Sequence, residues 1–290
     1  ALWMESDRMG HMLGAIDQQG LDTQRGVVQN EKREGENQPY GQADDEIFRA
    51  LYPKGHPYHH STIGSMNDLN AASLEDVKQW FRAWYGPNNA VLVLAGDIDV
   101  ATAKEKVTRY FGDIPAGPTL ERIPAGPVQD RQTTRATMSD KVPQPRIYRA
   151  WSVAPYGDAD LDRLQLVAQV LGGSKSSRLD RRLVHEEKLV DKVSAFVYPF
   201  ELASTFYITA DVRQGVDPAK VEKIIDEELR RLVAEGPTAA ELEQAQVMTR
   251  ASFVRGVERI GGFGGKADAL AECAVYSGDP GCFRDSLEVV

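Results

Sequence analysis

A strand followed by a long amphipathic helix occurs in both halves of the chain, and this repeat is the feature that most constrains the fold. In the first half, the apolar run at residues 90–95 is short enough for a buried strand, and a helix follows over about 100–110. In the second half, residues 205–212 alternate as a half-buried strand does, and Asp217-Pro218 opens a helix. The pattern predicts an α+β fold of two related domains, each a mostly antiparallel sheet packed against helices.

Further helix and strand signals support this interpretation. Ser73-Leu-Glu-Asp76 and Thr238-Ala-Ala-Glu241 have the pattern of capping boxes that open helices. Residues 146–153 are predicted to form a strand, and residues 160–171 a helix. The stripes expected in the core are Val77, Trp80, Phe81, Trp84 and Tyr85 in the first half and Val221, Ile224, Ile225, Leu229, Leu232 and Val233 in the second.

The boundary between the two domains is expected in the proline-rich segment from Pro115 to Pro145. This segment carries six prolines and few long apolar runs. A chain of 290 residues is long enough for two domains that each bury a core. We therefore expect residues 1–120 to be the C-terminal part of a first domain. Residues 121–290 are expected to be a second, homologous domain that is truncated at its C-terminal end.

Composition argues against two classes of partner and leaves the state of the cysteines open. The net charge of −9, without a concentrated basic patch, argues against general nucleic-acid binding. No apolar run approaches the roughly 18 to 20 residues of a membrane span. Cys273 and Cys282 flank a turn-rich stretch and are predicted either to form a disulfide or to be two free buried thiols. A disulfide would favour an extracytoplasmic location.

The segment that ends at Glu31 places a carboxylate where an unpaired charge is expensive. If this segment is helical, Val27 and Val28 lie four and three residues before Glu31 and share its face. A carboxylate on the apolar side of a helix must be neutralised. Glu31 is therefore predicted either to pair with a lysine or arginine or to bind a metal.

Several segments match one protein family in the same order along the chain. In the first half they are Ala1-Leu-Trp-Met-Glu-Ser-Asp-Arg-Met-Gly10, Gln24-Arg-Gly-Val-Val-Gln-Asn-Glu31, Asn37-Gln-Pro-Tyr-Gly41, Gly55-His-Pro-Tyr-His-His60, Ile63-Gly64, residues 85–97 and Tyr110-Phe-Gly-Asp-Ile-Pro115. In the second half they are Gly172-Gly-Ser-Lys-Ser-Ser-Arg-Leu179 and Gly261-Gly-Phe-Gly-Gly-Lys-Ala-Asp268. Together they resemble the pitrilysin/insulinase family of zinc peptidases over nearly the whole chain.

The resemblance implies a zinc site that these residues only partly provide. Family members hold Zn²⁺ with the inverted motif His-x-x-Glu-His and a distant glutamate, and Glu31 matches that glutamate. The inverted motif, with its general-base glutamate, is absent from these residues and is expected upstream. A catalytic zinc needs three protein ligands and a water. We therefore expect a zinc-dependent endopeptidase in the full-length protein, and an inactive fragment here that has no catalytic residue and no stoichiometric zinc.

Two local patterns resemble ligand-binding motifs but do not satisfy them. His56 and His60 have the i, i+4 spacing of helical metal ligands, but Gly55 and Pro57 favour a turn, so we expect a structural loop. Residues 261–266 resemble a phosphate-binding loop, but Ile260 stands where the motif needs glycine. Tight turns are the simpler interpretation of these glycines.

The resemblance also implies a partner half and a polypeptide substrate. Family enzymes bind the substrate and its developing oxyanion with an arginine and a tyrosine from a second half or subunit. Val184 and Asp191 occupy the matching places here, so a second peptidase-like half, on this chain or another, is expected to supply the pair. The expected substrate is a peptide or an unfolded polypeptide.

A glycine- and serine-rich turn is the candidate substrate-binding segment. Residues Gly172, Gly173, Ser174, Lys175, Ser176 and Ser177 align with a region that lies near a substrate-anchoring site in insulin-degrading relatives. Exposed backbone there could pair with an extended peptide. The alternative is a simple turn between helices.

Other classes of function are compatible with the same fold. The main alternative is a non-catalytic core subunit, of the kind found in respiratory complexes, that acts as a scaffold or peptide-binding partner. A chaperone-like clamp without hydrolysis is a third. Glu31 favours the peptidase, because a degenerate subunit has no need of an acid on that face. The bacterial periplasm or secretion is expected rather than the cytoplasm.

Overall fold

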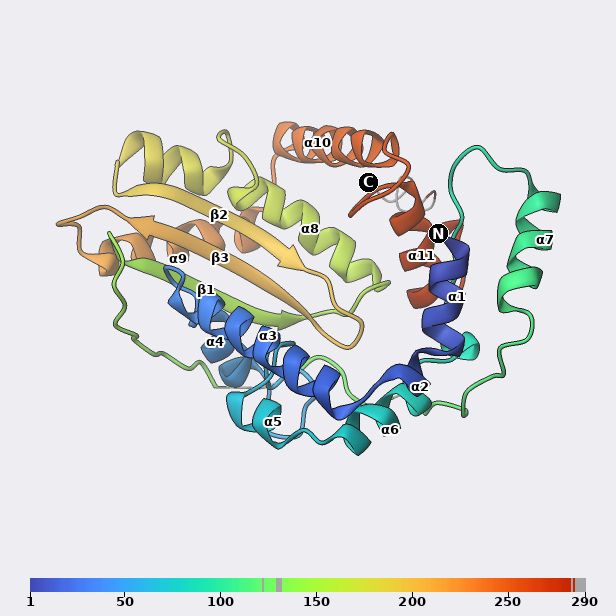
Figure 1. The fold of residues 1–290 in the computed structure, drawn as a ribbon. Coiled ribbons are helices and arrows are strands. Elements are labelled where there is room, and N and C mark those ends of the chain that lie inside the picture. Colours follow the sequence, from blue (N-terminus) through green and yellow to red (C-terminus); the bar gives the residue numbers. More distant parts are fainter. Residues whose placement is uncertain (122, 129–131, 283, 285–290) are drawn as a thin grey trace. The chain divides into compact units, whose positions relative to one another are not determined.

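The computed structural model describes residues 1–121, 123–128, 132–282 and 284. By its internal contacts the chain divides into two compact units (Figure 1). Unit 1 consists of Ala1–Gly41, Ser61–Pro124 and Val257–Gly281, and unit 2 consists of Gln42–His60, Ala125–Gly256 and Cys282–Val290. Helices combined with an antiparallel sheet confirm the predicted α+β class. The predicted division into domains of similar topology at 1–120 and 121–290 stays a prediction.

Unit 2 is built on a three-stranded antiparallel sheet in the order β1-β3-β2 (Figure 1). β1 (Arg146–Val153) pairs with β3 (Ser204–Val212) along its whole length. β2 (Val190–Tyr198) pairs along the other side of β3, with a bulge between Val190 and Lys192. The strands predicted at 146–153 and 205–212 are confirmed.

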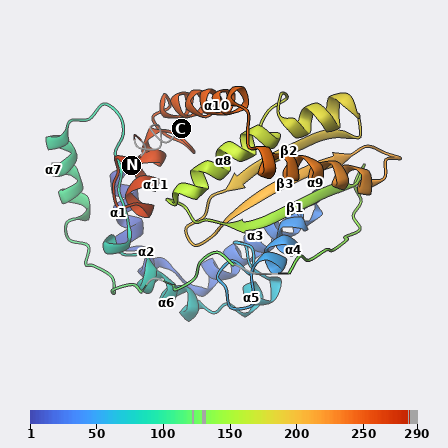
Figure 2. The same ribbon diagram turned by 180° about the vertical axis from the view of Figure 1, so that it is seen from behind.

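Helices cover one face of this sheet and enclose the core of unit 2. They are α8 (Ala159–Gly172), the π-helix η2 (Asp180–Glu186), α9 (Pro218–Glu235) and α10 (Ala239–Val257). Alternate residues of β3, such as Ile208 and Val212, pack with Leu171 of α8 and Ile225 of α9. Figure 2 shows α9 crossing the strands on this side. The predicted core stripe of α9 is wrong at Val233, which is 87% exposed because it lies on the solvent side of the helix.

The opposite face of the sheet is covered by α4 (Ala43–Leu51) and the loop that follows it. The Tyr52 hydroxyl lies 3.2 Å from Thr205 Oγ1, and Tyr207 donates a hydrogen bond to Asp44. Thr205 and Tyr207 alternate in β3 with the residues that face the core, so they point to the other side. Both faces of the sheet are therefore covered within unit 2.

Unit 1 is helical over its described residues. Its elements are α1 (Leu2–Gly10), α2 (Met12–Ala15), α3 (Gln18–Asn37), α5 (Met66–Ala71), α6 (Leu74–Trp84), the 3₁₀-helix η1 (Pro87–Asn89), α7 (Val100–Phe111) and α11 (Lys266–Tyr276). The predicted capping box at the start of α6 is confirmed, since Ser73 and Asp76 exchange both hydrogen bonds. The helix predicted at 100–110 is also confirmed, as α7.

Two predictions for unit 1 are wrong for the same physical reason. Residues 90–95 form no strand, and Val91 and Leu92 are 45% and 44% exposed. The stripe on α6 buries Phe81 but leaves Trp80 and Trp84 59% and 40% exposed. A strand needs a neighbouring strand for its hydrogen bonds, and an apolar helix face needs a sheet to cover it. The described residues of unit 1 provide neither.

The structure also bears on the cysteines and on membrane spans. Cys273 and Cys282 are disulfide-bonded, which decides between the two states that the sequence left open. Within the part of the chain that the structure describes, no helix has the length and apolar character needed to cross a membrane.

Candidate functional site

Helix α3 carries the candidate zinc ligand, and a polar stripe fixes its orientation within unit 1. Asp17 caps its first turn by accepting a hydrogen bond from the Gly20 N–H at 2.7 Å. Arg25 donates from Nε to the Leu69 carbonyl at 2.9 Å and from Nη2 to the Ala72 carbonyl at 2.6 Å. These contacts bind the middle of α3 to the end of α5.

The same stripe continues along α3 to its C-terminal half. Gln29 donates to the Asn70 side chain at 2.7 Å, and the buried Lys32 ammonium pairs with Glu36 at 2.9 Å. Positions 25, 29, 32 and 36 share one helix face at the spacing of i, i+3 and i+4 neighbours. The buried face of α3 is therefore polar rather than apolar.

The prediction that Glu31 lies on a buried apolar face is wrong. Glu31 is exposed, and Val27, one turn earlier, is 45% exposed. The reason is that Arg25, Gln29 and Lys32 face the interior of the unit instead. Among the described residues, none forms a hydrogen bond or ion pair with the Glu31 carboxylate. An exposed carboxylate remains hydrated at little cost, so burial no longer argues for a metal here, and the metal role stays a prediction.

The described residues do not form a zinc site on their own. They contain no group of three or more histidine, cysteine, aspartate or glutamate side chains that could hold a metal ion. A catalytic zinc requires three protein ligands. Glu31 could supply one of them, and the other two would have to come from residues other than the described ones.

The histidines of residues 56–60 hold backbone groups within a non-helical loop, as predicted. The Tyr58 N–H donates to His56 Nδ1 at 3.0 Å, so Nδ1 is the acceptor of that ring. His56 Nε2 then carries the proton and faces the Gly126 carbonyl at 3.1 Å. His59 Nδ1 lies 2.8 Å from the Tyr52 carbonyl. These ring nitrogens are used in loop structure rather than turned toward a shared metal.

The predicted substrate segment, residues 172–177, forms the turn that follows α8. Gly172 is buried, and a Cβ there would lie 2.4 Å from the Ala195 backbone nitrogen in β2. A Cβ at Gly173 would lie 2.1 Å from Gln169 Oε1. Both glycines therefore permit close packing. The Ser177 hydroxyl donates to the Ser174 carbonyl at 2.6 Å and closes the turn, while Lys175 and Ser176 are exposed.

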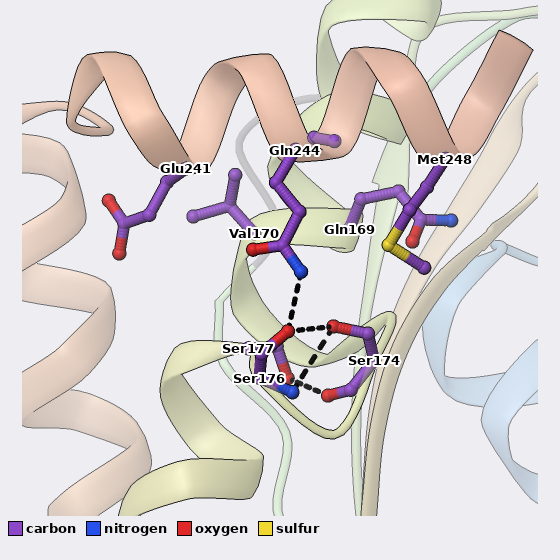
Figure 3. A pocket seen from close by; sticks show the side chains of 9 residues that line it. Gln169, Val170, Ser174, Ser176, Ser177, Glu241, Gln244 and Met248 are labelled. Atoms are coloured by element: carbon purple, nitrogen blue, oxygen red, sulfur yellow. Dashed lines mark hydrogen bonds between the residues drawn. The ribbon is translucent and has the colours of Figure 1, made fainter.

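This turn forms a small polar pocket together with α8 and α10 (Figure 3). Gln244 of α10 donates to the Ser176 hydroxyl at 2.5 Å, and the Ser174 and Ser176 hydroxyls lie 3.0 Å apart. Gln169 Oε1 is buried and accepts no hydrogen bond from the described residues. The free space is about 10 Å³, so it admits at most one water molecule. A larger ligand would lie on the rim.

The α10 side of this pocket was not apparent from the sequence. Glu241, Gln244, Ala245 and Met248 recur at helical spacing and line it together. The confirmed capping box at Thr238 and Glu241 located the start of this helix. What the sequence did not show is that the face carrying Gln244 packs against the turn after α8.

A buried ion pair supports the same region. Arg178, only 3% exposed, donates from Nε and Nη2 to the two carboxylate oxygens of Glu241 at 2.8 and 2.7 Å. The bidentate hydrogen bonds from Arg178 lower the pKa of Glu241 to about 2, and the Thr238 N–H adds to this effect. The pair joins the turn after α8 to the start of α10.

At the two positions that match the substrate-binding arginine and tyrosine of family enzymes, this chain has residues with structural roles. Val184 packs against the hydrophobic core of unit 2. Asp191 lies at the bulge of β2 and pairs with Arg213 at 2.8 Å. Neither side chain could replace an arginine or tyrosine in oxyanion binding.

Comparison with known proteins decides the family. Residues 71–248, more than half of the chain, match the family described as "Peptidase M16 inactive domain". The chain belongs to the peptidase M16 family. This confirms the resemblance to pitrilysin/insulinase peptidases that the sequence motifs indicated.

Relatives within the M16 family include both named proteases and a named non-peptidase. The chain is 27% identical over 240 residues to "Zinc protease PqqE" of Helicobacter pylori, covering 81% of this chain and 54% of that protein. It is 26% identical over 197 residues to "Non-peptidase homolog YmxG" of the same organism, covering 66% and 44%. The chain thus spans about half the length of the curated relatives it matches.

A solved structure gives the same fold. The crystal structure of a protease from Helicobacter pylori aligns with a TM-score of 0.83 at 22% identity, covering 98% of this chain and 70% of that chain. At this identity the match establishes the M16 fold and no more. The family therefore contains zinc proteases and non-peptidases that this fold alone does not distinguish.

Proposed function

We propose that the protein containing this chain is a zinc-dependent endopeptidase in which Glu31 is one of the zinc ligands. The observation that carries the proposal is the Glu31 carboxylate, which is exposed and unbonded among the described residues while Arg25, Gln29 and Lys32 of the same helix are all engaged. Glu31 matches the distant glutamate of the inverted zinc motif. Relatives named as zinc proteases support the same assignment.

The contribution of this chain would be a positioned anionic ligand. A carboxylate oxygen is a normal zinc ligand, and its charge raises the affinity of the site. Because the described residues hold no complete ligand set, the two histidines and the general base would come from an upstream His-x-x-Glu-His. A second peptidase-like half would supply the arginine and tyrosine that Val184 and Asp191 do not provide.

Substitution of Glu31→Gln in the full-length protein tests the proposal. The change keeps the size of the side chain and removes its charge, so zinc affinity and peptidase activity should fall by at least roughly 100-fold, more than the loss for an outer partner of a ligand. Because Glu31 is exposed, the melting temperature should stay unchanged. Glu34→Gln, also exposed on α3, is the matched control. Normal zinc content and normal activity in Glu31→Gln would refute the assignment.

A non-catalytic M16 subunit is the second candidate, and two observations favour it. The matching family is described as an inactive domain, and one relative is named a non-peptidase homolog. Such a subunit would use the same fold as a scaffold or as a peptide-binding clamp. Peptide cleavage by the full-length protein that disappears with a chelator would exclude this alternative. Absence of peptide cleavage, together with loss of a ligand from His-x-x-Glu-His, would establish the non-catalytic subunit.

We further propose that the serine hydroxyl groups of the turn at residues 172–177 contact a peptide substrate. Gly172 is buried, which argues against backbone pairing there, whereas Ser176 is exposed at the rim of the pocket. Ser176→Ala should raise KM for peptide by about 2- to 10-fold, the worth of one hydrogen bond, with kcat unchanged. An unchanged KM would leave the turn a structural element only.

The disulfide supports a proposal on location. Structural disulfides such as that between Cys273 and Cys282 occur mainly in oxidising compartments, which favours the periplasm or secretion. When intact cells are treated with an alkylating agent, mass spectrometry should find both cysteines unmodified, because the disulfide protects them. Alkylated, reduced cysteines would place the protein in the cytoplasm.

A further inference from the structure

The junction of α8, α9 and α10 in unit 2 contains an apolar hollow of about 200 Å³ that is open to solvent on one side. It is separate from the polar pocket in Figure 3, although Val170 of α8 lines both. The proposed peptidase chemistry makes no use of it. Its walls consist of six aliphatic residues: Leu166, Val167, Val170, Leu232, Pro237 and Leu242.

Hydrogen bonds at the connection between α9 and α10 fix two walls of this hollow. Gly236 follows the end of α9 with a left-handed backbone, at φ of 72°, and its carbonyl accepts a hydrogen bond from Arg178 Nη2 at 3.0 Å. The same buried guanidinium binds Glu241 in the first turn of α10. Because Arg178 fixes the end of one helix and the start of the next, the hollow is formed before a ligand arrives. A preformed site costs less to occupy than one that the ligand must open.

The lining selects a ligand that is a simple aliphatic chain. Among the described residues that line the hollow, Arg163 alone has a polar side chain, and none has an aromatic ring. A peptide would leave its amide groups without partners against these walls, which is costly. A hydrocarbon chain has no such groups. At roughly 30 Å³ for each water-sized group, the hollow has room for a chain of about six or seven carbon atoms.

Arg163 gives the hollow a cationic group that is available to an anionic ligand. Its Nη1 donates to Asp160 at 2.6 Å, and the two side chains are 73% and 69% exposed. Exposed pairs of this kind contribute little to stability, so a ligand carboxylate can replace Asp160 at small cost. A guanidinium can bind both oxygens of a carboxylate at once. The site therefore combines an aliphatic cavity with a cation on its lining.

We propose that this hollow binds the anion of a medium-chain fatty acid. The aliphatic tail lies between α8, α9 and α10, in contact with Val170, Leu232 and Leu242, and the carboxylate binds Arg163. The site is independent of Glu31 and of zinc, so its test neither supports nor weakens the proposed peptidase function. Because the three helices form the site only when unit 2 is folded, the ligand should also raise the melting temperature of the protein.

Isothermal titration of the full-length protein with octanoate, kept below the concentration at which it forms micelles, tests the proposal. One equivalent should bind saturably. From butanoate to octanoate the affinity should rise roughly fourfold for each added methylene group. It should rise little further for decanoate, because the hollow is then full. Absence of octanoate binding would overturn the proposal. Binding of several equivalents, or an affinity that keeps rising through dodecanoate, would also overturn it, because adsorption to the surface behaves in this way.

Variants of the two parts of the site locate the ligand. Val167→Phe fills the hollow and should weaken octanoate and octanol binding by at least roughly 10-fold. Val247→Phe, the same change at an exposed position of α10 outside the lining, is the matched control and should bind both normally.

The charged end of the ligand is tested at exposed positions, where substitution keeps the fold. Arg163→Gln should weaken octanoate binding roughly fivefold and leave octanol binding unchanged, because octanol carries no charge. Asp160→Asn frees Arg163 and should strengthen octanoate binding by a similar factor. If Val167→Phe fails to fold, as judged by circular dichroism, these two variants decide alone. Equal octanoate affinity in wild type, Arg163→Gln and Asp160→Asn would refute the assignment of the carboxylate to Arg163 and with it the proposed site.

Discussion

The ion pair between Arg178 and Glu241 allows a quantitative prediction for Glu241→Gln. The carboxylate accepts two hydrogen bonds from Arg178, at 2.8 and 2.7 Å, and one from the Thr238 N–H at 2.8 Å. The pKa of Glu241 falls from an ordinary value of 4.5 to about 2. At about 1.36 kcal/mol for each pKa unit, this difference corresponds to about 3 kcal/mol. The side chain is 25% exposed, so solvent screening reduces the figure to about 2 kcal/mol.

The substitution also leaves a buried cation without its counter-charge. Arg178 is 3% exposed, and its Nη1 already lacks a hydrogen-bond partner among the described residues. Removal of one partner of a buried pair costs about 3–5 kcal/mol in typical cases. We therefore expect Glu241→Gln to lower the free energy of unfolding by about 3 kcal/mol at pH 7. Urea unfolding followed by circular dichroism measures this loss.

The pH dependence of that loss gives a second check. Because the folded-state pKa is lowered, the stabilisation is fully present above pH 4.5 and is lost as the pH falls toward 2. At pH 3 the difference between wild type and Glu241→Gln should shrink to roughly half or less. Glu243→Gln, an exposed neighbour on α10, should change stability by no more than about 0.5 kcal/mol. A difference that is below 0.5 kcal/mol at pH 7, or equally large at pH 3, would refute the reasoning.

Three further predictions concern other parts of the chain. After exhaustive dialysis this chain should retain no equivalent of zinc by metal analysis, because Glu31 has no accompanying ligands among the described residues; a full equivalent bound through Glu31 would contradict this. Cys273→Ser removes the disulfide that closes the ten-residue loop 273–282 and should lower the free energy of unfolding by about 2–3 kcal/mol in chemical denaturation without reductant; an unchanged free energy of unfolding would show that the bond does not form. Gly172→Ala places a methyl group 2.4 Å from the Ala195 nitrogen and should cost roughly 1–3 kcal/mol by thermal melting; an unchanged melting temperature would show that α8 and β2 can separate freely.

Elements whose partners are close in sequence, or whose pattern fixes their environment, could be predicted. The capping boxes at Ser73 and Thr238 need only residues three positions away, and both formed. The alternation over 205–212 identified β3 because one of its faces is apolar and packs on helices. Interactions between residues that are close in the sequence, and the alternation of a half-buried strand, can therefore be predicted from the sequence.

Features that depend on distant partners were predicted poorly. Val27 and Glu31 share one helix face, and the valine suggested that this face is buried. Instead, Arg25 and Gln29 face the interior, because α5 offers them carbonyl and amide partners. The run at 90–95 has the composition of a strand but no strand beside it among the described residues. Likewise, nothing near residue 174 indicates that Gln244 lies next to it.

The contact of Tyr52 with the sheet of unit 2 has a consequence for synthesis of the protein. Tyr52 and its partner Thr205 are 153 residues apart in the chain. At a translation rate of about 5–20 residues per second, β3 is made on the order of ten seconds or more after Tyr52. During this interval the rings of Phe48, Tyr52 and Tyr58 have no sheet to cover them. The aromatic side chains at one end of the chain therefore remain without their sheet partners until most of the protein has been synthesised.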